Sequence, residues 1–407
     1  MSEHDEKRQE QRPPTGEAPF GLDEVFFSRT DARGVIQAGN YVFRRVAHYD
    51  WGQLIGAPHK IIRHPDMPKG LFRFFWDTIQ RKEIVGAYVN NRSKDGLYYW
   101  VFAVIVPCDD GYLSVRIKPT SETFTMIQGL YAEQRALEVE KNLDPGESAE
   151  WMLNKLQEHG FSDYGRFMAH ALTEELISRD AGLGREPDQT ILQFRKMQSA
   201  ADRLTGETDG LITEFGRSAI IPHNMRVIAS RLESNGGPIS TLSANYGEMS
   251  RQMSGWFESN VVGKNSNFSK IRSTVTKCMF MTCMSRILFE CSQQLNTERR
   301  KLGEIDLEVE RKTITSLAEY YRSQSSSEQH RLDDEIRRIF ESCKIMNRHM
   351  LGLSTSRVMC KIESARLSHG REALTDTIAE LNSFQERIRS KLGTIENLSD
   401  DIRTLLV

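Results

Sequence analysis

Cysteine is scarce in this chain of 407 residues, which contains six. No two of the six form a C-x-x-C pair, so the sequence gives no support to a zinc cluster or to a disulfide framework. Reduced thiols in the cytoplasm are the simplest interpretation of so few cysteines.

Long apolar runs are also missing. The first residues, MSEHDEKRQEQRPP, are charged and lack the apolar core of a secretory signal. The most apolar later stretch, Val275 to Cys291, is interrupted by Lys277 and Arg286 and is too short to span a bilayer comfortably. Hydrophobic residues still make up 39 % of the chain, so we expect a soluble protein with well-formed cores and no membrane span.

An excess of charge of either sign is absent. The chain has 54 Lys and Arg against 56 Asp and Glu, and this balance predicts no nucleic-acid partner. The sequence also lacks a P-loop, a His-Glu-x-x-His zinc motif and a Gly-x-Ser-x-Gly elbow. His223 is followed by no glycine-rich nucleotide loop of the kind that a histidine kinase needs. We therefore expect a protein that is not an enzyme.

Residues 20–120 have the texture of a small α+β domain, behind a polar lead-in at 1–19 that we expect to be disordered. Asp-Gly pairs, the strongest short hairpin signal, lie on both sides of a β-prone run. The pattern predicts three antiparallel strands and a preceding helix. These are Ala87 to Asn91, Tyr98 to Pro107 and Tyr112 to Lys118, with the helix at Gly70 to Arg81.

After Pro119 the strand signals end and helical periodicity takes over. The pattern predicts a helical connector at 121–186 and a helical bundle or coiled coil at 187–407, with a break at the serine-rich run Ser323 to Ser327. Apolar residues from Leu374 to Leu405 recur in steps of three and four, which is the narrow seam of a coiled coil. We expect a homodimer with this stripe in its interface. The alternative is that the last helix folds back on its own chain.

The segment Gly56 to Pro68, GAPHKIIRHPDMP, resembles a motif of the FAD-binding PAS sensor domain of aerotaxis receptors. The flanks agree with that family in order and spacing, and the similarity covers about residues 26–120. They include Thr30-Asp31 with Gly34 and Ile36, then Asn40, Tyr49, Phe72, Trp76, Asn91-Arg92 and Tyr99-Trp100-Val101. The resemblance implies a PAS fold that binds FAD and senses redox state or oxygen.

Matched positions give the residues that the resemblance implies for the flavin site. They are Asn40, His59, Arg63, His64, Asp66, Trp76 and Asn91. Guanidinium and imidazole groups can donate to polar ring edges or phosphate, an indole can stack on a flat ring, and amides suit the flavin edge. A purely structural interpretation is that Pro65 and Pro68 shape a turn and that Asp66 caps the next helix.

The resemblance has departures. Val85 stands where family members usually carry an aromatic residue, so it removes a ring from the pocket region. The helical region lacks the Glu-Ala-Ala-Arg-Ala-Gly-Glu run of chemoreceptor tips, and residues 224–240 are only loosely similar to it. The implied partner is a chemotaxis-type histidine kinase or coupling protein. Two alternatives stay open: a cofactor-free scaffold, and a haem sensor with His48, His59 or His64 as axial ligand.

Overall fold

The chain divides into two units in the computed structural model, which describes residues 12–218, 220–232, 237–260, 267–298, 301–302, 305–366 and 371–406. Residues 1–192 and 276–326 form what we call the sheet unit, and residues 193–275 and 327–407 form the bundle unit. The helical periodicity predicts that residues 276–326 belong to the helical tail, whereas in the structure these residues pack with the sheet.

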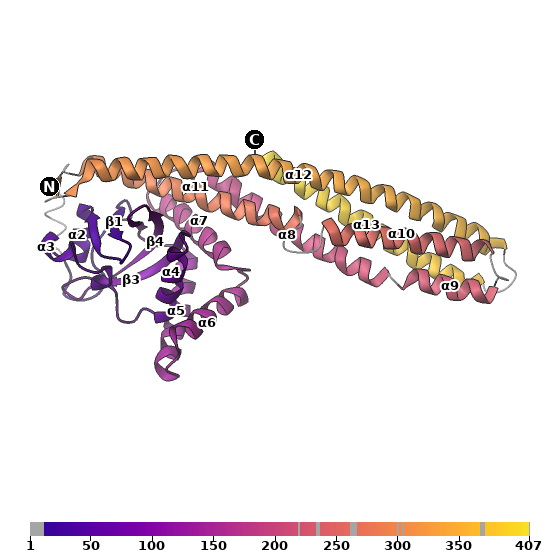
Figure 1. Ribbon diagram of the computed structural model, residues 1–407, viewed down its shortest axis with the longest axis horizontal. Helices are drawn as coiled ribbons and strands as arrows, with labels where there is room; N and C mark the ends of the chain where they lie inside the picture. The colour runs from indigo at the N-terminus through magenta and orange to yellow at the C-terminus, as the bar shows by residue number, and fades with distance from the viewer. Residues whose placement is uncertain are drawn as a thin grey trace. The chain divides into compact units, whose positions relative to one another are not determined.

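Five antiparallel strands form the sheet, in the order β2-β1-β5-β4-β3. They are β1 (Phe26–Asp31), β2 (Ile36–Gly39), β3 (Val85–Arg92), β4 (Tyr98–Cys108) and β5 (Gly111–Ile117). Figure 1 labels β1, β3 and β4 of this sheet. The predicted three-strand meander is confirmed to within two residues at each end. Gly111 is required at the start of β5, because a Cβ there would lie 2.6 Å from the carbonyl carbon of Asp31.

Short helices connect β2 to β3 across one face of the sheet. They are α2 (Tyr41–Ala47), α3 (Trp51–Leu54), the 3-10 helix η1 (His59–Ile62) and α4 (Lys69–Gln80). The predicted helix at Gly70 to Arg81 corresponds to α4, whose N-cap is Pro68 rather than Asp66. This strand order with the helical segment between β2 and β3 is that of a PAS domain, so the predicted fold class is confirmed.

The other face of the sheet packs against α5 (Glu122–Glu140) and α7 (Tyr164–Gly182), which follow β5. The helix between them, α6 (Pro145–Glu158), packs mainly against α4. Tyr88 of β3 stacks on Phe124 of α5, with ring centroids 5.6 Å apart, and its hydroxyl donates to Glu175 of α7 at 2.8 Å. Because side chains alternate along a strand, Tyr88 faces these helices while Val89 and Asn91 face the opposite side.

Glu175 joins three elements of the sheet unit. Its buried carboxylate accepts from Tyr88 of β3, from the backbone N–H of Thr120 at 2.6 Å and from the hydroxyl of Ser121 at 2.5 Å. Ser121 is the N-cap of α5. Burial raises the pKa of Glu175 above its ordinary value, although the hydrogen bonds it accepts oppose this shift.

Parts of two later helices complete the sheet unit. They come from α11 (Asn267–Thr297) and α12 (Leu307–Arg366), which run antiparallel here and pair through hydroxyls, with Ser292 bonded to Thr315 at 2.7 Å and Ser285 donating to the Ala318 carbonyl at 2.8 Å. Two-residue strands, β6 (Lys301–Leu302) and β7 (Ile305–Asp306), lie between them.

The break predicted at Ser323 to Ser327 is not found, because α12 is continuous through it. Ser325 donates from its hydroxyl to the carbonyl of Cys278 at 3.3 Å, and Ser326 donates to the carbonyl of Arg322 at 3.2 Å. Serine disfavours a helix interior mainly because its hydroxyl competes for backbone groups. Here tertiary and i−4 acceptors satisfy these hydroxyls, and the serine run instead marks the boundary between the two units.

Residues 1–11 of the predicted disordered lead-in lie outside the described residues. The described remainder, residues 12–19, makes defined contacts with the rest of the sheet unit, contrary to the prediction of disorder. The N–H of Ala18 donates to the Tyr98 carbonyl at 2.7 Å, and Arg12 forms two hydrogen bonds to Asp95 at 2.6 and 2.9 Å. Residues 16–18 therefore pair with the start of β4, and Arg12 contacts the turn before it.

The described residues of the bundle unit are almost all helical. It contains most of α8 (Gln189–Ser218), then α9 (Ile221–Leu232), α10 (Pro238–Asn260), the first part of α11, the second part of α12 and α13 (Arg371–Leu405). The predicted turn at residues 235–238 falls partly outside the described residues.

The stripe that we expected at a dimer interface is buried inside this unit. Leu374, Leu381, Ile388 and Ile395 are fully buried within the single chain. Beside the stripe, Arg387 and Lys391 of α13 pair with Glu214 and Glu207 of α8 at 2.7 and 3.1 Å. The last helix thus folds back on its own chain, which was the alternative interpretation, and the homodimer stays a prediction without this stripe as its cause.

None of the helices in the described ranges combines the length and apolar character that a bilayer crossing requires.

The contact of α4 with α6 gives a first prediction. A Cβ on Gly70 would lie 2.6 Å from the backbone nitrogen of Ala149, so Gly70→Ala must separate the two helices. We expect it to lower the free energy of unfolding by about 1–3 kcal/mol. Gly129→Ala is the matched control, because this helical position has open space around it and should gain stability. Urea denaturation of both variants measures the difference, and equal stability would contradict the close approach.

Candidate functional site

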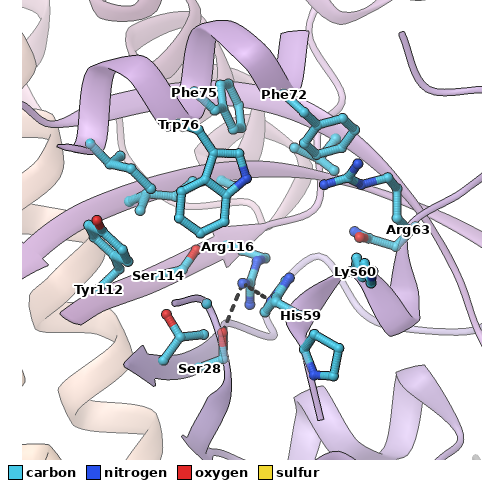
Figure 2. A pocket seen from close by; sticks show the side chains of 18 of the residues that line it. Ser28, His59, Lys60, Arg63, Phe72, Phe75, Trp76, Tyr112, Ser114 and Arg116 are labelled. Atoms are coloured by element: carbon cyan, nitrogen blue, oxygen red, sulfur yellow. Dashed lines mark hydrogen bonds between the residues drawn. The ribbon is translucent and has the colours of Figure 1, made fainter. Parts of the chain in front are cut away.

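A cavity of about 290 Å³ lies between α4 and the sheet (Figure 2). Aromatic side chains of α4 cover one side of it, and polar side chains of β1, β5 and η1 line the other. Ligand pockets commonly have volumes of roughly 300–1,000 Å³. The cavity can therefore take a ring system but not a whole dinucleotide.

Trp76 and Phe72 of α4 form the aromatic side. They lie about one turn apart on the helix, and Figure 2 shows both rings directed toward the sheet. The Trp76 ring meets Tyr112 of β5 edge-on at 6.0 Å. Gly34 makes room for it, since a Cβ there would lie 2.8 Å from the indole and the backbone φ is +78°. The turn between β1 and β2 thus also positions the indole.

Arg116 of β5 lies on the opposite side and is only 5 % exposed. Its Nη2 donates to Ser28 Oγ of β1 at 2.8 Å and to His59 Nε2 of η1 at 2.8 Å, while its Nη1 has no partner among the described residues. Burial lowers the pKa of Arg116 to about 10, which leaves it charged at neutral pH. None of the residues that line the cavity is acidic, so the cavity carries positive charge.

His59 accepts from this guanidinium, so its Nε2 is unprotonated and the ring is neutral. Burial, together with the charges of Arg116 and Arg63, holds the pKa of His59 well below its usual range. The ring also stacks on Phe43, with centroids 6.1 Å apart and planes at 6°. The imidazole is therefore fixed in position and in tautomer.

Arg63 and Asn91 meet at one end of the cavity. The two residues form an antiparallel bridge between the segment after η1 and β3. The Arg63 guanidinium lies 3.5 Å from the centroid of the Phe72 ring, a cation–π contact. The Nε of Arg63 and the Nδ2 of Asn91 are buried donors that have no partner among the described residues. Such buried donors are costly without an acceptor, which a water molecule or a bound ligand would supply.

Four of the seven residues predicted from the sequence line this cavity, namely His59, Arg63, Trp76 and Asn91. Asn40, His64 and Asp66 do not. Asn40 caps α2, accepting from the N–H groups of Phe27 at 3.0 Å and Phe43 at 3.2 Å. His64 Nδ1 accepts from the Asp66 backbone, and the Asp66 side chain is 83 % exposed.

Sequence reasoning missed the β5 residues of the site. Tyr112, Ser114 and Arg116 all line the cavity. They alternate with buried apolar residues of β5, and this period-2 pattern was the signal that could have found them. Val85 is buried on β3 and is not among the residues that line the cavity.

Comparison with known proteins gives one curated relative. The chain is 35 % identical over 133 residues to an aerotaxis receptor of Escherichia coli (strain K12), and the match covers 31 % of this chain and 26 % of the receptor. The chain thus spans about a quarter of the length of the curated relative it matches. No family model matches the sequence. Together with the PAS fold, this partial homology supports a PAS signalling sensor.

Solved structures with a likeness to this chain include two light sensors. The LOV domain of the blue-light photoreceptor Aureochrome1 is 20 % identical with a TM-score of 0.22, covering 25 % of this chain and 85 % of that one. A blue-light activated histidine kinase of Erythrobacter litoralis is 14 % identical with a TM-score of 0.24, covering 44 % of this chain and 58 % of that one.

Proposed function

We propose that this protein is a redox or oxygen sensor whose PAS domain binds FAD and passes a conformational change to its helices. The observation that carries the proposal is the cavity beneath Trp76, in which Arg116, Arg63 and Asn91 present buried donor atoms that have no partner within the described part of the chain. A flavin ring is flat and carries several acceptors along its polar edge, so it matches an aromatic wall opposite a set of donors. The partial homology to an aerotaxis receptor supports the same assignment.

The residues of the cavity fit the ring part of the cofactor. Arg116 and Asn91 would hold the polar edge, and Trp76 would cover a ring face. Because the cavity is small, the phosphate-bearing part of FAD would have to extend past the lining, where the exposed Lys60 offers a positive charge. A bound flavin supplies reversible electron transfer with a change in the charge and protonation of its ring.

The chain's own residues offer a route from the cavity to the helices. Arg116 lies on β5, and β5 leads within a few residues to Ser121, the N-cap of α5. When the charge beside Arg116 changes, the guanidinium can redistribute its hydrogen bonds between Ser28, His59 and the ligand. A shift of β5 then acts on the start of α5. Such a switch requires two arrangements of similar free energy.

The proposed output is altered binding to a chemotaxis-type histidine kinase or coupling protein, without catalysis by this chain. A cytoplasmic location and a homodimer belong to the same proposal. A haem sensor is less well supported by the site: of the three candidate histidines only His59 lines the cavity, and its Nε2 already faces Arg116.

Flavin content tests the proposal. The full-length protein should release about one FAD per chain on heating, and Trp76→Ala or Arg116→Met should weaken FAD binding about ten-fold or more, because each removes a wall or a charged donor. Asp66→Asn is the control, since this exposed side chain lies outside the cavity. Wild-type protein that stays colourless after refolding with FAD favours the cofactor-free scaffold. An intense Soret band indicates haem instead.

A further inference from the structure

An exposed apolar stripe runs along α12 in the bundle unit, on the side of the helix away from the core. Leu351 is 63 % exposed, Val358 50 %, Met359 44 % and Ile362 44 %. Their spacing of i, i+7, i+8 and i+11 places them on one helix face. On the same helix Met350, Leu353 and Cys360 are buried. The second part of α12 is therefore apolar on two sides, and only one of them is used by the core.

Positive charge surrounds this stripe. Residues 344–366 contain five Lys or Arg and one Glu, whereas the whole chain has a formal net charge of −2. The nearby carboxylates are already paired, Glu341 with Lys344 at 2.8 Å and Glu363 with Arg366 at 2.9 Å. Arg348 and Lys361, both exposed, form no ion pair with any residue in the described ranges. The stripe thus has an apolar centre and basic flanks, in which Lys344 and Arg348 have Glu341 nearby, Arg366 has Glu363, and Lys361 forms no ion pair within the described residues.

We propose that this face of α12 is a docking site for an amphipathic helix of another protein, with apolar residues at heptad spacing and acidic residues beside them. Helix-on-helix recognition uses anchors at i, i+3 or i+4 and i+7, and flanking charges select the partner. The inference does not depend on the flavin.

The charges argue against a second copy of the chain as the occupant. Two α12 stripes brought together in either direction set basic flank against basic flank, and such like-charge contact costs affinity. A lipid surface is also a poorer match. Helices that lie in membrane interfaces commonly carry Trp or Phe on the apolar face. This stripe contains only Leu, Val, Met and Ile, and it exposes only two or three of these side chains in every two helical turns.

Fluorescence anisotropy with the full-length protein tests the site. The probe is a synthetic labelled helix with Leu at heptad a and d positions and Glu beside them. One control peptide carries Lys in place of Glu, and a second has the acidic peptide's composition in scrambled order. We expect the acidic helix to bind at least about ten-fold more tightly than either control, because it alone has both the spacing and the charge.

Variants assign the binding to this face. Leu351→Ser with Val358→Ser should weaken the acidic helix about ten-fold or more, whereas Val309→Ser, at an equally exposed valine near the start of α12, should leave it unchanged. Arg348→Glu with Lys361→Glu should transfer the preference to the Lys peptide, a result that misfolding cannot produce.

Three outcomes overturn the proposal. Equal binding of the scrambled peptide would show that charge attraction alone, without the heptad spacing, explains the binding. A full-length dimer by light scattering that dissociates on Val358→Ser assigns the stripe to a second copy. Binding to phosphatidylserine vesicles that is lost in the Leu351→Ser, Val358→Ser variant, without binding of the acidic helix, assigns it to a membrane.

Discussion

Replacing Glu175 with alanine should lower the free energy of unfolding of the sheet unit by about 3–5 kcal/mol. The Glu175 carboxylate is the acceptor for Tyr88, for the backbone N–H of Thr120 and for Ser121. Alanine leaves these donors buried without an acceptor, and each such donor costs about 1–3 kcal/mol. The start of α5 should then separate from β3.

Tryptophan fluorescence during urea denaturation measures this loss, because four of the five tryptophans lie in the sheet unit. Glu133→Gln, at an exposed position of α5, is the control and should change stability by less than about 0.5 kcal/mol. A Glu175→Ala protein as stable as wild type would falsify the role of this carboxylate at the junction.

The same carboxyl group should give the sheet unit a pH dependence of known sign. Its pKa is raised in the folded state from the ordinary value of 4.5, mainly by burial. Between that ordinary value and the raised one, the folded state binds more protons than the unfolded state. Stability therefore falls as pH rises through this window. Glu175→Gln should remove that part of the slope, and an unchanged pH profile in the variant would assign the slope to another group.

Asp180→Ala should have an effect of similar size, about 3–5 kcal/mol. Asp180 of α7 is 1 % exposed and accepts from both terminal nitrogens of Arg286 of α11, one of them at 2.8 Å. Arg179, next to it, pairs with Glu290 of α11 and donates to the carbonyl of Leu22 at 2.8 Å. Removing Asp180 takes the nearest carboxylate from a half-buried guanidinium, which keeps Glu290 at 3.2 Å and Asp188 at 3.7 Å.

A double replacement distinguishes two free-energy changes: the cost of leaving one buried charge without its partner, and the net contribution of the ion pair to stability. Asp180→Leu with Arg286→Met removes both charges and should recover much of the stability that Asp180→Ala loses, since an apolar pair of similar volume often replaces a buried ion pair at little cost. Asp77→Ala, which breaks the exposed pair of Asp77 with Arg73 on α4, should have no resolvable effect. If the double variant is as unstable as the single one, packing rather than charge explains the loss.

Local signals predicted much of the fold. The hairpins of β3, β4 and β5 follow from Asp-Gly pairs between β-prone runs, and α4 and α13 follow from helical periodicity. The failures are all long-range. The serine run of α12 predicts a break in the helix, but the carbonyl of Cys278, 47 residues away in the sequence, accepts from Ser325 and the helix continues. The apolar stripe of α13 has the width of a coiled-coil seam and predicts a dimer interface, but α8 of the same chain packs beside it.

The site shows the same division. One half of the cavity could be predicted from the sequence, because the residues of η1 and α4 that line it are close together in the chain. Arg116, at the centre of the other half, reaches the site only through sheet pairing of β5 with β1. Asn40 has the side chain expected of a ligand, but its four hydrogen-bonding contacts are to the protein, including Val25 and Glu298.

The return of residues 276–326 to the sheet sets an order of events during synthesis. The backbone of Val25 pairs with Gln294, and Arg29 of β1 pairs with Glu310, across 269 and 281 residues of sequence. At about 5–20 residues per second, the ribosome needs roughly 13–54 s to supply Gln294 after Val25. During that time β1 and the N-cap of α2 lack their last partners. Nascent chains stalled before residue 276 should consequently be more sensitive to protease at β1 than chains released beyond residue 326.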